Sequence, residues 1–128
     1  MGRQYSADEI ILMAFYAEWI RDIPDMRSVQ PDNLYMDRDV FLWGLIKLSV
    51  MGWVQGVSWQ PATANMPKKV QSLSMENIML TREGVLHAQE IAEVGKECRN
   101  KIMANLVEIF RDIGSGTFAN IISNRLGL

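Results

Sequence analysis

Several features that mark particular protein classes are rare or missing in this chain of 128 residues. There is one cysteine, Cys98, so no disulfide can form within the chain and a reducing compartment is expected. There is one histidine, His87, which excludes a metal site built on two histidines. No run of 18 apolar residues occurs, so we expect no membrane span, and the first residues do not resemble a secretory signal. We therefore expect a cytoplasmic protein.

Groupings of residues that are typical of catalysis are missing as well. No nucleophile motif accompanies His87, and Cys98 has neither a second cysteine nor a nearby histidine in the sequence. The segment Gly114-Ser115-Gly116-Thr117 opens a helix but lacks the Lys-Ser/Thr ending of a phosphate-binding P-loop. We expect a protein that is not an enzyme and that uses no cofactor, no metal and no small-molecule ligand.

Positive charge is scarce, since the net charge is −2. Residues 1–40 carry eight acids and four bases, residues 41–80 carry one acid and three bases, and residues 81–128 carry six of each. The only basic excess therefore lies in the middle third. No overall basic field indicates a nucleic-acid partner, so any such contact has to come from this local excess.

Helical patterns occupy the first 51 residues. Ser6 and Glu9 form a capping-box pattern ahead of an apolar helical repeat, which predicts a helix that ends near residue 22, before Pro24. Residues 31–34 are typical of a turn that enters a short second helix. A third helix is predicted up to Gly52, because glycine commonly takes the left-handed conformation that ends a helix.

A strand–loop–strand pattern follows the third helix. Residues 53–59 are rich in tryptophan and valine, which favours a strand, and residues 75–80 are predicted to be its partner. Residues 60–74 contain prolines, lysines and small polar residues without a sustained period, so we expect a long loop, or wing, there.

Three helices are predicted after this pattern. Thr81 is expected to cap a helix that reaches about Val94, and a second helix is expected over residues 96–113. Thr117 is expected to cap a last short helix after the glycine-containing break at residues 114–116.

The residues around the wing carry a resemblance. The run Leu45, Leu48, Met51-Gly52-Trp53-Val54, followed by Leu80-Thr81-x-x-Gly84, resembles the third helix, wing and exit helix of winged helix-turn-helix proteins. With two further helices after it, the plan is similar to that of the YjcQ-like group of bacterial and phage proteins, which has no established activity. The resemblance implies a mainly α (α+β) fold, with a winged-helix domain over residues 1–94 and a dependent helical extension over residues 95–128.

Winged helices usually bind duplex DNA, with the third helix in the major groove and the wing near a phosphate backbone. The resemblance and the charges together give candidate DNA contacts, which are Arg38, Lys47, Ser49, Lys68 and Lys69. Helical spacing assigns one face of the third helix to the core: Phe41, Gly44, Leu45, Leu48 and Met51. The opposite face is mostly apolar and includes Leu42, Trp43, Ile46, Ser49 and Val50. Either this face is covered by the C-terminal helices or by another subunit, or the helix enters a groove through its few polar residues.

The C-terminal helices show an apolar stripe that needs a partner. It either packs back on the chain itself or forms a homodimer interface. The candidate interface residues are Leu42, Trp43, Ile46, Ile102, Leu106, Phe110, Ile113, Phe118, Ile121 and Ile122. The sequence thus leads to two hypotheses: a homodimeric DNA-binding transcriptional regulator, or a protein-interaction or scaffold module that does not bind DNA.

Overall fold

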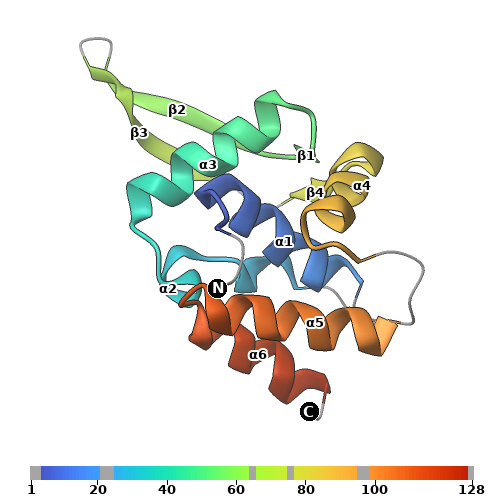
Figure 1. Ribbon diagram of the computed structural model, residues 1–128. Coiled ribbons are helices and arrows are strands. Elements are labelled where there is room, and N and C mark those ends of the chain that lie inside the picture. Colours follow the sequence, from blue (N-terminus) through green and yellow to red (C-terminus); the bar gives the residue numbers. More distant parts are fainter. Residues whose placement is uncertain (1–3, 21–24, 64–65, 75–76, 95–98, 127–128) are drawn as a thin grey trace.

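Six α-helices and two small antiparallel sheets make up the described part of the protein (Figure 1). The structure, a computed structural model, describes residues 4–20, 25–63, 66–74, 77–94 and 99–126, with only the backbone described at 59–63, 66–74 and 125–126. The helices are α1 Ala7–Trp19, α2 Pro31–Leu34, α3 Arg38–Val50, α4 Arg82–Ile91, α5 Arg99–Asp112 and α6 Gly116–Leu126, with a 3-10 turn, η1, at Met26–Ser28. None of the described helices is long and apolar enough to cross a bilayer.

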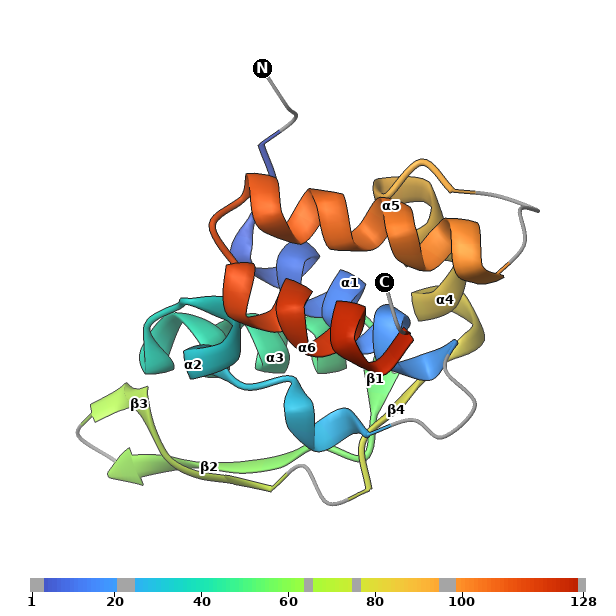
Figure 2. The ribbon, with the colours of Figure 1, turned by 90° about the horizontal axis from the view of Figure 1, so that it is seen from below.

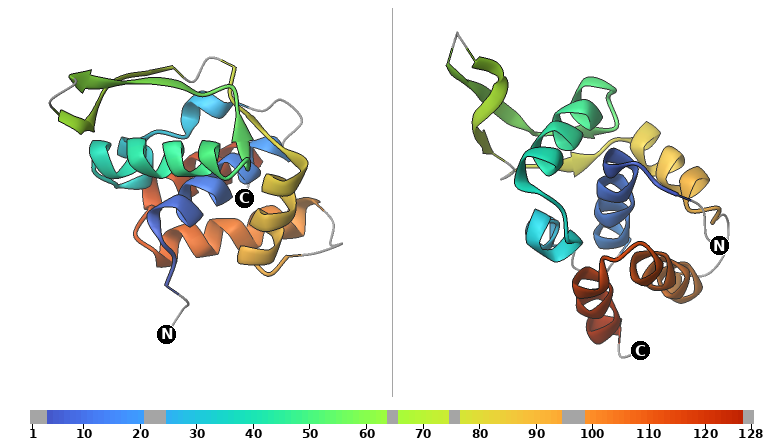
Figure 3. Two further views of the ribbon diagram at one scale, coloured as in Figure 1. Left: turned by 90° about the horizontal axis from the view of Figure 1, so that it is seen from above. Right: turned by 60° about the vertical axis from the view of Figure 1, so that its left-hand side comes forward.

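Helix α1 is the centre of the fold. All its residues from Ile11 to Glu18 are buried, and it contacts α3, α4 and α5, which surround it (Figure 3, right). A helix segment that is enclosed on every side is normally apolar all round, and residues 10–17 of α1 are. Its start is the predicted capping box: the Ser6 amide donates to Glu9 Oε1 at 2.9 Å, and the Glu9 amide donates to Ser6 Oγ at 3.4 Å.

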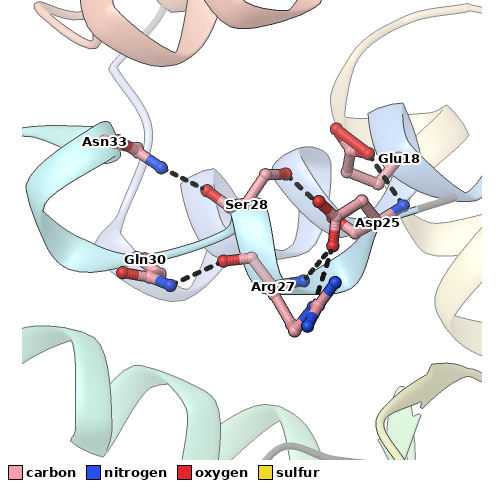
Figure 4. A network of polar contacts seen from close by, with 6 residues as sticks. All are labelled: Glu18, Asp25, Arg27, Ser28, Gln30 and Asn33. Carbon is pink, nitrogen blue, oxygen red and sulfur yellow. Dashed lines mark hydrogen bonds and ion pairs between the residues drawn. The ribbon is translucent and has the colours of Figure 1, made fainter.

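A polar network connects the end of α1 to α2 (Figure 4). Glu18 is fully buried, and its Oε1 accepts a hydrogen bond from the Asp25 amide at 3.0 Å. The Ser28 hydroxyl donates to the Asp25 carbonyl at 2.9 Å, and Asn33 Nδ2 donates to the Ser28 carbonyl at 2.7 Å. These bonds satisfy partly buried backbone groups of an irregular segment.

The two sheets form one interrupted ribbon after α3. Strand β1 (Val54–Gln55) pairs with β4 (Met79–Leu80), and β2 (Ser58–Thr63) pairs with β3 (Met66–Ser74), each time antiparallel. The predicted pairing across the wing is confirmed where Val54 lies opposite Leu80. The prediction of a loop over residues 60–74 was wrong, because most of that segment is a β-hairpin.

The prolines of this segment contributed to the prediction of a loop, since proline cannot donate a backbone hydrogen bond to a neighbouring strand. The β2–β3 hairpin is a sheet of two strands, so each strand has an outer edge where the missing donor does no harm. The register also shifts on both sides of Pro61: Gln60 lies opposite Ser72, Pro61 opposite Val70, and Thr63 opposite Met66. The extra residues of β3 form bulges, and Lys68 and Lys69 belong to this irregular part.

The C-terminal helices pack against the rest of the chain. Helix α5 contacts α1, α6 contacts α2, and α5 and α6 lie side by side (Figure 2). The Phe110 and Phe118 rings meet edge to face with centroids 4.9 Å apart. The Ser115 hydroxyl donates to the Leu34 carbonyl at 2.7 Å. Helix α6 begins at Gly116 with Ser115 before it, so the prediction that Thr117 caps this helix was wrong.

Removal of the Glu18 carboxylate should destabilise the fold, because the Asp25 amide would lose this partly buried hydrogen bond to a charged acceptor. We expect Glu18→Ala to lower the free energy of unfolding by about 1–3 kcal/mol, measured by urea denaturation. Glu18→Gln keeps one acceptor oxygen and should lose less. Glu108→Ala, at an exposed position of α5, is the matched control and should stay within about 0.5 kcal/mol of the wild type. Equal stability of Glu18→Ala and the control would contradict this role.

Candidate nucleic-acid interface

The end of α3 is fixed by the residues that begin α4. Gly52 has φ +78°, and the next amide, of Trp53, donates to the Leu48 carbonyl at 3.0 Å, which ends α3 as the sequence predicts. The Thr81 hydroxyl donates to the Gly52 carbonyl at 2.6 Å, and the Thr81 amide donates to the Trp53 carbonyl at 3.1 Å. The same hydroxyl accepts from the Gly84 amide at 3.1 Å and so caps α4.

We call Gly52, Trp53, Thr81 and Gly84 the Thr81 junction. A Cβ atom on Gly84 would collide with the Trp53 carbonyl, so only glycine lets the backbone of α4 approach this closely. The His87 ring stacks on the Trp53 ring with centroids 3.8 Å apart and an interplanar angle of 25°. The junction therefore holds α3, the ribbon and α4 in a fixed mutual arrangement.

Helix α3 leaves a narrow stripe exposed. Helices α1 and α2 contact it from one side, and β3 contacts it from another; the hairpin lies along it (Figure 3, left). Leu42 and Ile46 are buried, so that side of the helix is covered within the chain, but the main neighbours of α3 are α1, α2, β1 and β3 and not the C-terminal helices that we expected there. Met51 is 46% exposed, so its predicted place in the core was wrong; it lies past the last residue of the helix. The largest exposed side chains of the stripe are Val40, Trp43, Lys47 and Val50.

The candidate cations of α3 have acidic neighbours. Lys47 Nζ lies 3.5 Å from Asp8 Oδ2, and Arg38 Nη1 lies 3.8 Å from Asp39 Oδ1. Both cationic side chains are more than half exposed, so water screens these pairs and each contributes little stability. The two side chains are therefore available to a competing anion. Ser49, the third candidate on α3, is half-buried.

The other candidate cations lie on β3. The backbone at Lys68 and Lys69 belongs to that strand, while their side chains fall outside the described residues. Because β3 contacts α3, the structure brings the two groups of candidate positions to the same side of the molecule (Figure 1).

Most candidate interface residues are covered by the chain's own packing. The buried ones are Leu42, Ile46, Ile102, Leu106, Phe110, Phe118 and Ile122. Ile113 and Ile121 are half-buried, and Trp43 is 39% exposed. The apolar stripe of α5 and α6 thus follows the first alternative, packing back on the chain, and its buried members offer no surface to a second subunit.

An apolar hollow that the sequence did not indicate lies between the end of α1 and α4. It has a volume of about 390 Å³ and is lined by Trp19, Leu80, Thr81, Arg82, Val85, Leu86 and Gln89. Two of these, Trp19 and Leu86, are 43% and 55% exposed. The helical period of α4 distinguishes Leu86 from the buried face of Ala88 and Ile91, but it does not reveal that Trp19 lies across from it.

Comparisons with known proteins return nothing for this chain: no family model, no curated protein and no solved structure matches it. Within the described part of the chain, no three histidine, cysteine or acidic side chains gather as a metal site requires.

The close approach at Gly84 gives a sharp test of the Thr81 junction. We expect Gly84→Ala to lower the free energy of unfolding by about 2–3 kcal/mol and the melting temperature by roughly 10 °C, because two backbone segments must separate. Gly116→Ala is the matched control, since nothing lies within 4 Å of a Cβ at that position. The control should be as stable as the wild type or slightly more stable. Two variants of equal stability in thermal denaturation would show that the junction does not constrain the fold.

Proposed function

We propose that this chain is a winged helix-turn-helix protein that binds duplex DNA as a regulator. The observation that carries the proposal is the placement of positive charge. Between positions 25 and 80, four of the five lysines and arginines belong to α3 or β3. These two elements contact each other and lie on one side of the molecule.

The arrangement suits a helix in a groove with a hairpin beside it. Arg38 lies at the start of α3 and Lys47 near its end, so the two cations are separated by about 13 Å along the helix axis and by about half a turn around it; Lys47 shares the exposed stripe with Trp43, and Arg38 lies in the exposed first turn. Lys68 and Lys69 on the neighbouring strand would add contacts to a phosphate backbone. Phosphate contacts of this kind position a protein on DNA without reading its sequence.

This surface can distinguish few DNA sequences. Base edges are recognised by hydrogen-bonding side chains, and α3 exposes few of them besides Lys47 on the stripe and Arg38 in its first turn. This surface offers at most four phosphate contacts. A plot of the logarithm of the association constant against the logarithm of the salt concentration should therefore have a slope of about −3.6. We therefore propose modest binding that depends strongly on salt.

A second candidate function rests on the apolar part of the same stripe. Val40, Trp43 and Val50 are 44%, 39% and 78% exposed on α3. Exposed aromatic and aliphatic residues on one helix face are typical of a surface that binds another protein. In this alternative, the protein is an interaction module and the hairpin lysines protect the strand edges from unwanted pairing.

The first experiment measures DNA binding through the hairpin. Random-sequence duplex is titrated by fluorescence anisotropy at several salt concentrations with the wild type and with Lys68→Glu plus Lys69→Glu. We expect wild-type binding at tens of micromolar or tighter in low salt. Loss of two phosphate contacts should reduce the slope to about −1.8, and the new charges should weaken binding further.

The matched control has the same charge change elsewhere. Lys101→Glu plus Arg111→Glu alters two exposed residues of α5, on the other side of α1 from the hairpin. This variant should keep the wild-type slope. Equal losses in both double variants would indicate only a net-charge effect, and no binding by the wild type would overturn the DNA proposal.

The second experiment separates the two candidate functions on α3. Trp43 lies about one helical turn before Lys47 on the exposed stripe, so Trp43→Arg adds a cation where a groove-facing helix would meet phosphates. We expect this variant to bind DNA more tightly and to make the salt slope more negative by about 0.9. An unchanged slope would mean that α3 does not face DNA and would favour the interaction module.

A further inference from the structure

Helix α4 presents a face that is complementary to itself. Arg82 lies four residues before Leu86 and Glu90 lies four residues after it, so the three share one side of the helix. All three are exposed. Within the described part of the chain, neither Arg82 nor Glu90 takes part in an ion pair.

Two copies of this face match when they run antiparallel. A two-fold axis at Leu86 places Arg82 of each copy opposite Glu90 of the other, because the two residues are equally far from the centre. Two ion pairs, each between Arg82 of one copy and Glu90 of the other, then lie on either side of the contact between the two Leu86 side chains. Such a contact is isologous: both subunits use the same patch, which must therefore be complementary to itself.

The apolar surface around Leu86 also suits a contact between two copies of α4. Leu86 projects with 55% of its surface exposed and lines the hollow between α4 and the end of α1. The hollow, of about 390 Å³, has Trp19, Leu80 and Val85 in its wall. Leu86 thus lies at the edge of an apolar recess, so a second copy that packs against Leu86 also covers part of this recess.

We propose that this chain forms a homodimer through α4, with Leu86 at the two-fold axis and reciprocal Arg82–Glu90 ion pairs. The buried apolar stripe of α5 and α6 offers no surface for this contact, whereas Leu86 and Trp19 are exposed. A single helix pair with a small apolar centre makes a small interface, so the dimer should dissociate in the micromolar range. The contact does not depend on DNA, and its tests need none.

The first test exchanges charges and measures mass by sedimentation velocity from about 5 to 200 µM. We expect the wild type to dimerise and both Arg82→Glu and Glu90→Arg to weaken the dimer about tenfold, since two attractive pairs become repulsive. The double variant Arg82→Glu plus Glu90→Arg restores opposite charges across the axis and should recover most of the affinity. An acid in the first turn and a base in the last turn suit the helix dipole, so these variants should remain folded.

Recovery in the double variant is the decisive result, because a contact with any other surface would not reverse the two single effects. A wild type that is monomeric at 200 µM would overturn the proposal. A dimer that none of the three variants affects would overturn it as well, because the interface would then lie elsewhere.

The second test places a cysteine on the two-fold axis. Cys98→Ser removes the natural thiol, and Leu86→Cys in that background brings two sulfurs together only if the axis passes at Leu86. We expect a disulfide-linked dimer under mild oxidation on a non-reducing gel. Val50→Cys in the same background is the control, because Val50 is even more exposed, at 78%, but lies on α3. Equal cross-linking of both variants, or none by Leu86→Cys, would contradict the proposed axis.

Discussion

The hydrogen bonds of Thr81 are the constraint on which the arrangement of the other elements depends. One hydroxyl donates to the Gly52 carbonyl and accepts from the Gly84 amide, so it joins the end of α3 to the start of α4 across 29 residues of chain. The close contact of Gly84 with the Trp53 carbonyl leaves no room for a side chain between these elements. The ribbon between them must therefore leave α3 and return to α4 at one fixed place.

The consequence for α3 is that its exposed surface is narrow. Helix α1, enclosed on all sides, supports one side of α3, and the hairpin returning toward the junction lies over another. Leu42 and Ile46 are buried as a result, while Trp43 and Lys47 remain accessible. The same packing that stabilises the helix thus reduces the number of side chains that it can present to a partner. Any recognition by α3 must rest on a single row of residues one helical turn apart.

Local signals in the sequence predicted the ends of elements well. The Ser6–Glu9 capping box, the stop at Gly52 and the cap at Thr81 each depend on residues within a few positions of one another, so their chemistry can be recognised without the fold. Which segments cover a given surface depends on residues that are far apart in the sequence, and the sequence did not reveal these segments. The hairpin over residues 58–74 was hidden by loop-like composition, and the periodicity of α5 and α6 gave an apolar face without identifying α1 and α2 as its partners.

The two proposals are connected by the small number of cations on the α3–β3 side. Four candidate phosphate contacts per subunit give only modest affinity, because each contributes through counterion release and few are present. A dimer through α4 would bring a second set of four to the same duplex, and the second subunit would bind at a high effective concentration. That gain requires the α3 helices of both copies to face the DNA together. The Thr81 junction makes this a geometric condition, since it fixes the direction of α3 relative to α4 within each subunit.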